Sequence, residues 1–126
     1  MIVLAVDPGE ARAGCAISDP SGTIATPLGV VEPPDPAAVA ELATERRAER
    51  VVVGLPISLD GREGAQARAA REFRDALAAK LDIPVETFDE RLTTKLAAAT
   101  ARGGAAAPAD ALAAAHLLES YLASTQ

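Results

Sequence analysis

Three short apolar runs follow one another in the first 31 residues, and their close spacing limits the possible folds more than any other feature of the chain. The runs cover residues 2–6, 14–18 and 23–31. Asp7 and Asp19 end the first two runs, each directly before a proline, and the spacers are short enough for hairpins. Pro27 favours a bulge or an edge position for the third run, because proline cannot donate to a central ladder. The segment therefore predicts a three-stranded antiparallel meander.

After the meander, the chain alternates between helical and strand patterns. Helices are expected over residues 37–48, 65–81, 93–101 and 111–122, and strands over residues 51–53 and 85–88. Right-handed crossovers make the two later strands parallel to the first, with helices on both faces of the sheet. The length of 126 residues suits one domain. We predict a single α/β domain over residues 1–126, with a five-stranded mixed sheet. The 51–53 strand lies beside the first strand, and the 85–88 strand lies outside it.

Composition and charge exclude several classes of protein. A net charge of -6 argues against a protein that coats nucleic acid through bulk charge, although local basic patches remain open. One cysteine excludes an internal disulfide, and one histidine excludes a Cys/His zinc cluster. Cys15 is expected in the core, and His116 in a structural or surface role. The chain has no stretch of about 18 apolar residues and no basic leader, so we expect a soluble cytoplasmic domain without a membrane span.

Acidic residues stand where several predicted elements reach one edge of the sheet. Asp7 ends the first strand, Asp89 and Glu90 end the last, and Asp110 lies at the start of the final helix. Open α/β sheets bind ligands beyond the carboxyl ends of their strands, where the strand order reverses. Two carboxylates about 4 Å apart repel by roughly 4 kcal/mol at an effective dielectric near 20, so converging acids need a proton, a cation or a counter-charge. Because histidine is scarce, an oxygen-liganded ion such as Mg²⁺ or Mn²⁺ fits best.

Each of these acids also has an interpretation without catalysis. Asp7 before proline and glycine is good turn chemistry. Asp110 suits the positive end of a helix dipole. Asp89 and Glu90 can equally be solvated loop charges or partners of Arg91. Their joint occurrence at one edge is what favours a functional site.

Arginines flank the same edge of the predicted sheet. Arg12 lies in the turn after the first strand, and Arg62 and Arg91 lie beyond the carboxyl ends of later strands. Guanidinium groups match the geometry of phosphate oxygens. Acidic metal ligands flanked by arginines therefore predict phosphodiester chemistry, with Arg12, Arg62 and Arg91 as nucleic-acid contacts.

The helix expected over residues 65–81 carries two kinds of side chain. Arg68, Arg71 and Arg74 fall on the face away from the apolar stripe and are expected in solvent. Phe73 falls on the apolar face, and both it and Phe88 are expected in the core. No aromatic platform for base stacking is therefore predicted, and sequence-specific base reading is not supported.

Four segments resemble motifs of the YqgF/RuvX family, which comprises pre-16S rRNA nucleases related to Holliday-junction resolvases. Residues 7–14 read DPGEARAG and are similar to the opening motif of that family. Residues 53–64 resemble its second motif, and residues 89–94, DERLTT, resemble its third. Residues 110–122 are similar to its C-terminal helix. The motifs occur in the family's order and run nearly from end to end of the chain.

The resemblance implies an RNase H-like fold and a metal-dependent nuclease acting in 5′-end maturation of 16S rRNA. Position by position, it implies Asp7, Glu90 and Asp110 as catalytic residues and metal ligands. Asp89 is a fourth candidate ligand that can instead orient a neighbour. The implied cofactor is Mg²⁺ or Mn²⁺. The implied partners are precursor rRNA, structured or junction DNA, and precursor 30S particles, for a chain that acts as a monomer or homodimer.

The chain departs from the family pattern before the last helix. Members often carry a longer, lysine-rich stretch there, whereas residues 102–108 form a short stretch with a single charge. We therefore expect a weaker RNA contact at that place, or one that depends on a partner.

Three other functions are compatible with parts of the sequence. The first is resolution of four-way DNA junctions, which normally needs a dimer. The second is a non-catalytic ribosome- or RNA-associated factor that keeps the fold, although every candidate acid is present. The third is a sugar-kinase or actin-like ATPase, which also begins with a strand and an Asp-x-Gly turn. That class holds its nucleotide between two lobes, and the chain is long enough for only one.

Overall fold

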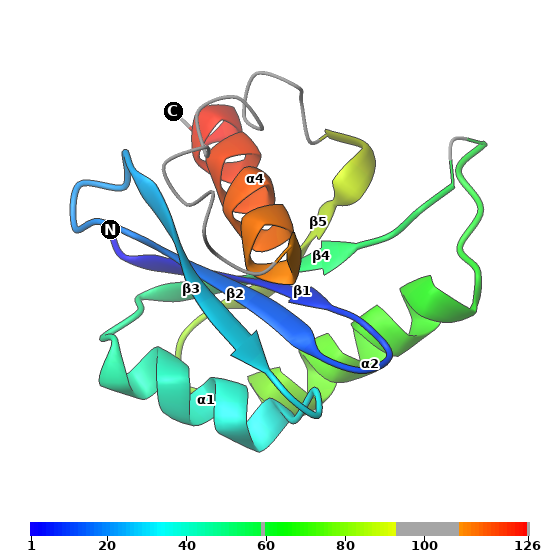
Figure 1. The fold of residues 1–126 in the computed structure, drawn as a ribbon, viewed down its shortest axis with the longest axis horizontal. Coiled ribbons are helices and arrows are strands. Elements are labelled where there is room, and N and C mark those ends of the chain that lie inside the picture. The colour runs from blue at the N-terminus through cyan, green and yellow to red at the C-terminus, as the bar shows by residue number, and fades with distance from the viewer. Residues whose placement is uncertain (59, 93–108, 126) are drawn as a thin grey trace.

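The fold is described from a computed structural model, which covers residues 1–58, 60–92 and 109–125 (Figure 1). In chain order the elements are β1 (Val3–Pro8), β2 (Ala13–Ser18), β3 (Ala25–Val31), α1 (Pro36–Glu45), β4 (Arg50–Leu55), α2 (Ala65–Ala78), β5 (Val85–Asp89), the 3₁₀ helix η1 (Glu90–Leu92) and α4 (Ala109–Ser124). The helix predicted over residues 93–101 lies outside the described residues.

The five strands form one mixed sheet in the order β3-β2-β1-β4-β5. β2 pairs antiparallel with β1 and β3, whereas β4 pairs parallel with β1 and β5. The predicted meander and the predicted placement of the later strands are both confirmed. Pro27 lies on the edge strand β3, and the register with β2 shifts between Cys15 and Ala16, as proline in a strand favours.

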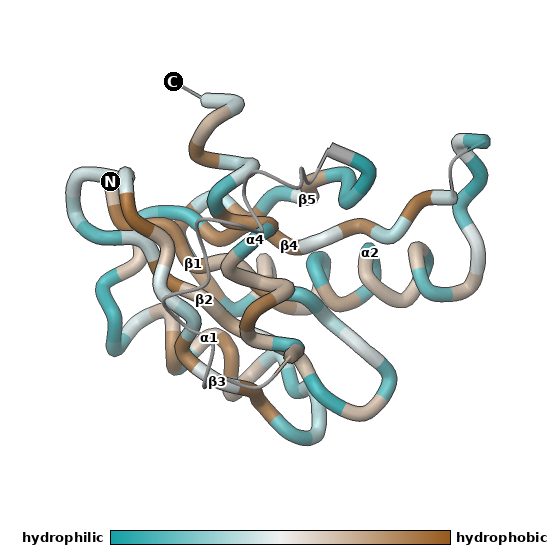
Figure 2. The backbone as a smooth tube through the Cα atoms, turned by 45° about the horizontal axis from the view of Figure 1, so that its top comes forward, coloured by the Kyte–Doolittle hydropathy of each residue, from teal (hydrophilic) through white to brown (hydrophobic). Residues whose placement is uncertain are grey.

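Helices cover both faces of the sheet, as predicted. Figure 1 shows α4 on one face and α1 and α2 on the other. Leu4 and Val6 of β1 pack into the cluster that includes α1 and α2, whereas Val3 and Ala5 pack into the α4 cluster. This alternation follows from the two-residue period of a strand. In Figure 2 the hydrophobic stretches follow the strands, which lie between these two layers.

Two helices, α1 and α2, end three residues earlier than the sequence predicts. The helix predicted over residues 37–48 ends at Glu45, because Arg47 adopts a left-handed conformation with φ of 57°. The helix predicted over residues 65–81 ends at Ala78, after which Lys80 and Leu81 donate to carbonyls only three residues back. Local turn hydrogen bonds, which the apolar pattern does not report, thus end both helices.

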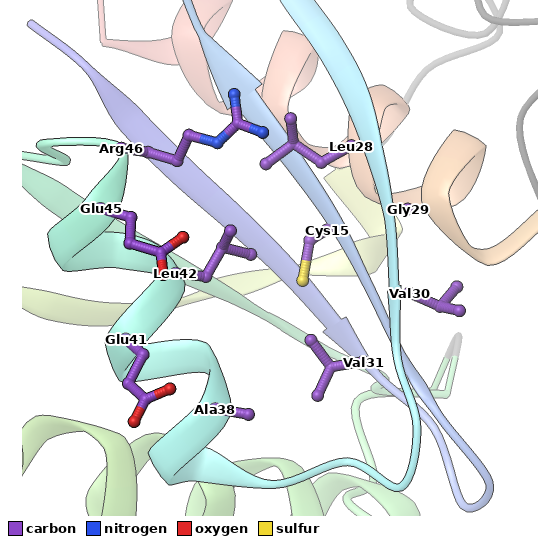
Figure 3. Close-up of a pocket in the computed structure, with 10 residues that line it drawn as sticks. All are labelled: Cys15, Leu28, Gly29, Val30, Val31, Ala38, Glu41, Leu42, Glu45 and Arg46. Atoms are coloured by element: carbon purple, nitrogen blue, oxygen red, sulfur yellow. The ribbon is translucent and has the colours of Figure 1, made fainter.

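Packing between β3 and α1 leaves a cavity of about 290 Å³ (Figure 3). Cys15, Leu28, Val31 and Leu42 line it, and Figure 3 shows their side chains gathered between the strand and the helix. Cys15 is buried as predicted, with 1% of its surface exposed, and burial raises the pKa of its thiol to about 11. Along the described ranges, no helix has the length and apolar character needed to cross a membrane.

Candidate active site

Asp7 lies near the carboxyl end of β1, on the sheet face that α4 covers. Val3 and Ala5 pack into the α4 cluster, and strand alternation puts Asp7 on the same side. Its cross-strand partner on β2 is Gly14. The side chain is half-buried at the edge of the sheet, where a carboxylate loses part of its hydration.

Glu90 reaches the same place from β5. It is the first residue of η1, directly after the strand ends. A Cβ atom added at Gly54 would lie 2.7 Å from the Glu90 Oε1 atom, so the glycine of β4 leaves the space that this carboxylate occupies. Asp7 and Glu90 are joined by a hydrogen bond between their side chains. The topology therefore brings together two acids that are 83 positions apart in the sequence.

The Asp7–Glu90 pair shares a proton at neutral pH. Burial first, and then the hydrogen bond with Glu90 and the charges of Glu90 and Asp110, raise the pKa of Asp7 from 3.8 to about 8. Protonated Asp7 then donates its hydrogen bond to a Glu90 side-chain oxygen. Two close carboxyl groups cannot both ionise without a counter-charge, and strongly perturbed acids of this kind mark candidate functional sites.

Asp110 is the third acid at this edge, in the first turn of α4. Its Oδ2 atom lies 3.3 Å from Nε of Arg12, and both side chains are about half exposed. A Cβ atom at Gly14 would lie 1.9 Å from the Asp110 carbonyl oxygen, so the glycine allows α4 to begin directly against β2. Asp110 thus lies near enough to raise the pKa of Asp7, while Arg12 supplies the counter-charge of Asp110.

Asp89 points away from the other three acids. It pairs in register with Leu55, whose side chain packs against α2 on the opposite face of the sheet. Both Asp89 oxygens accept hydrogen bonds from Arg91, at 2.9 Å and 3.1 Å from Nε and 2.6 Å from Nη2. This bidentate contact lowers the pKa of Asp89. The structure therefore places Asp89 with Arg91 and apart from the Asp7–Glu90 pair.

Arg62 lies on the loop before α2, and its side chain is 86% exposed. It pairs with Asp60 at 3.1 Å. The same loop is braced by Glu63, which accepts two hydrogen bonds of 2.7 Å from Arg71. Arg71 is exposed as predicted, but the apolar pattern of the sequence does not predict its ion pair with Glu63. The only signal available was an acid eight residues before an arginine, which is not a helical spacing.

The predicted metal ligands stay a prediction, and the geometry of the described residues bears on it in two ways. Within residues 1–58, 60–92 and 109–125, no three His, Cys, Asp or Glu side chains are arranged to hold a metal ion. The Asp7–Glu90 pair nevertheless offers hard oxygen donors that already need a proton to coexist, which is the donor chemistry that Mg²⁺ and Mn²⁺ take. Two of the four predicted ligands are therefore in contact, Asp110 is close to them, and Asp89 is not.

Comparison with known proteins gives consistent family matches. A family model described as "RuvX: Holliday junction resolvase" matches residues 1–124. A protein of Chloroflexus aggregans described as "Putative pre-16S rRNA nuclease" is 45% identical over 130 residues, covering 95% of this chain and 92% of the relative. A Thermobifida fusca protein of the same description is 50% identical over 105 residues, covering 81% of this chain and 66% of the relative.

A solved structure gives an independent view of the fold. Thermus thermophilus RuvC, in complex with a Holliday junction substrate, superimposes with a TM-score of 0.71 and 19% sequence identity. The match covers 99% of this chain and 95% of the RuvC chain. The predicted RNase H-like fold is thereby confirmed.

Proposed function

The chain belongs to the RuvX family, and from that premise we propose that it is a nuclease that hydrolyses phosphodiester bonds in 5′-end maturation of precursor 16S rRNA. The observation that carries the proposal is the hydrogen-bonded Asp7–Glu90 pair at the carboxyl edge, where burial first and then Glu90 raise the pKa of Asp7 to about 8. Burying two acids side by side without a counter-charge does not stabilise the fold, and strongly perturbed acids of this kind are typical of functional sites.

Asp7 and Glu90 would hold a divalent cation, Mg²⁺ or Mn²⁺, with Asp110 as the third acid close by. When bound, such a cation supplies a Lewis acid that activates water and stabilises charge on the leaving oxygen. Asp7 would release its proton to solvent when the site is loaded, because only the carboxylate is a ligand. Arg12 holds Asp110 at 3.3 Å and so keeps that acid at the edge.

Arg91 and Arg62 would contact the phosphates of the substrate. Asp89 fixes the Arg91 guanidinium through Nε and Nη2, which leaves Nη1 as the end directed towards the Gly61 loop. Arg62 stands on that loop with a largely exposed side chain. We therefore assign Asp89 to positioning Arg91 rather than to metal binding. Precursor 30S particles would present the RNA in the cytoplasm, to the chain as a monomer or homodimer.

Resolution of four-way DNA junctions is the second candidate function. The family model carries that description, and the RuvC chain that superimposes at a TM-score of 0.71 is in complex with a Holliday junction substrate. Identity to that chain is 19%, so the likeness supports the fold and leaves the substrate open. The two substrates must therefore be compared in one experiment.

The test is cleavage of a 5′-extended 16S rRNA fragment and of a DNA four-way junction, each with Mg²⁺, Mn²⁺ or EDTA. We expect cation-dependent cleavage of the RNA that EDTA abolishes. Glu90→Gln should lower the rate about 100-fold or more, because it weakens the proposed cation site. Glu86→Gln is the matched control, since Glu86 lies four residues earlier, at the other end of β5 and on the same face of the sheet, and it should retain activity.

Three results would count against the proposal. Symmetric nicking of the junction without RNA cleavage favours the second candidate. Binding of the RNA fragment without any cleavage favours a non-catalytic factor. Equal rates for Glu90→Gln and Glu86→Gln remove Glu90 from the site.

A further inference from the structure

A small cavity opens next to the proposed active site, between the β1–β2 turn and the first half of α2. Pro8, Gly9 and Glu10 line it from the turn, and Gln66, Ala69 and Phe73 line it from the helix. Its volume is about 230 Å³. Typical pockets for drug-sized ligands hold roughly 300–1,000 Å³, so this cavity suits a single ring system rather than a whole nucleotide.

The cavity and the Asp7–Glu90 pair are separated by one step of the chain. Pro8 directly follows Asp7, and consecutive Cα atoms lie about 3.8 Å apart. Strand alternation directs Asp7 towards α4 and Pro8 towards α2. The β1–β2 turn therefore contacts both the acidic site and the cavity. Arg12 pairs with Asp110 at the site, while Gly9 and Glu10 line the cavity.

The lining combines apolar walls with a polar mouth. The Pro8 ring, the Ala69 methyl group and the Phe73 ring supply the apolar surface, and Phe73 is 9% exposed. Exposed Glu10 and Gln66 supply a carboxylate and an amide oxygen, which accept hydrogen bonds. A carboxylate at the mouth repels a phosphate and favours a neutral ring that carries an amino group. Phe73, predicted in the core, thus also lines this space.

We propose that this cavity takes one unpaired, amino-bearing nucleobase of an RNA strand whose backbone lies against the Asp7–Glu90 pair. The inference rests on the proposed function for the kind of ligand, a nucleic acid. Continuity with the site, a size that fits one ring system, and the acceptors at the mouth identify the occupant. The pocket adds base contact to a site whose other proposed contacts all go to phosphates.

Filling the cavity tests the inference. Ala69→Leu places a larger side chain in the wall, whereas Ala76→Leu makes the same change at an exposed alanine of α2 that does not line the cavity. Both changes keep a good helix former, so both variants should fold. Binding is measured at fixed salt with EDTA present, for an oligoadenylate and for a chain of equal length without bases. EDTA prevents cleavage during the titration.

The wild type and Ala76→Leu should bind the oligoadenylate about tenfold more tightly than the abasic chain. Ala69→Leu should bind the two nearly equally, because only the base contact is lost. A full preference in Ala69→Leu, or none in the wild type, would overturn the inference. Cleavage of the rRNA fragment is scored separately. Base preference without cleavage removes the proposed function alone, and cleavage without base preference removes the base pocket alone.

Discussion

Two polar clusters occupy the same sheet face at opposite ends of β4 and β5, and they differ in how their charged side chains are compensated. One holds Asp7 and Glu90 at the carboxyl edge, next to Gly54. The other begins at Arg50 and Glu86, four residues earlier on each strand, or about 13 Å away. Both lie beneath α4. One end gathers acids around a shared proton, and the other balances its charges.

The Arg50 cluster is built from opposite charges and a phenol. Arg50 Nη1 donates to the Tyr121 hydroxyl at 3.0 Å and lies 3.5 Å from Glu86. The Tyr121 ring packs edge-on against Phe88, with ring centroids 5.7 Å apart. Within the described part of the chain, Arg50 Nε is the single buried side-chain nitrogen or oxygen without a partner. Apart from that atom, the cluster pairs opposite charges and a hydroxyl at this end of the sheet, as a structural site does.

The two clusters differ in their electrostatic free energy, and the unfavourable one lies at the carboxyl edge. Burying Asp7 beside other acids without compensation costs free energy in the metal-free protein, and the rise of the Asp7 pKa to about 8, caused first by burial and then by those acids, reflects that cost. We interpret the carboxyl edge as the functional end and the Arg50 cluster as the structural end. Changes at the first should alter cleavage more than stability, and changes at the second should do the opposite.

The largest effect should come from Asp7→Asn. Asparagine keeps the size and a hydrogen bond to Glu90 but cannot become a carboxylate ligand. We expect the rate of rRNA cleavage to fall about 1,000-fold, with no fall in the melting temperature. Steady-state cleavage and thermal unfolding measure the two quantities. Asp82→Asn, at an exposed loop position, is the control that should keep full activity. A melting temperature that drops together with activity would assign Asp7 to the structural class.

A smaller loss of activity should follow from Gly54→Ala. The new methyl group would lie 2.7 Å from Glu90 Oε1 and 3.1 Å from Leu117 Cδ2, so the flexible Glu90 side chain must move. Displacing a reacting group in this way should slow cleavage about 10- to 100-fold. The free energy of unfolding should change by only about 1 kcal/mol.

Gly64→Ala is the matched control for that change, because its methyl group would meet no atom within 4 Å. Cleavage assays on both variants, with denaturant unfolding alongside, separate the two effects. Equal cleavage rates for the two alanine variants would show that the position of Glu90 does not matter.

The stability of the metal-free protein should depend on pH through Asp7. Its pKa is about 8 in the folded chain against 3.8 ordinarily, so the folded state binds more protons between those values. The free energy of unfolding should therefore fall as pH rises from about 4 to about 8, by up to about 1.4 kcal/mol per pH unit, and then level off. Denaturant unfolding in EDTA measures this slope. Asp7→Asn should flatten it, and an unchanged slope in that variant would contradict the assignment.

The smallest effect is expected at the structural end, from Tyr121→Phe. The change removes the hydroxyl that accepts from Arg50, which should cost about 1 kcal/mol of unfolding free energy. Cleavage should be unchanged, because the cluster lies far from the carboxyl edge. A loss of cleavage at full stability would show that the two clusters are coupled.

The fold could be predicted further than the site. Strand order and the covering of both faces follow from local periodicity and crossover handedness, which the sequence displays directly. That Asp7 and Glu90 meet also follows, because parallel strands end at one edge. The face of Asp89 could not be fixed, since one residue of register decides it. The Arg50–Tyr121 contact joins residues 71 positions apart and leaves no local signal.

The most direct test of the central claim is a crystal structure of the protein soaked in Mn²⁺, with the ion located by its anomalous scattering. Our account predicts a peak within coordination distance of carboxylate oxygens from both Asp7 and Glu90, displacing their shared proton. A well-ordered map without a peak between these two residues, or with the ion bound only elsewhere on the chain, would contradict it.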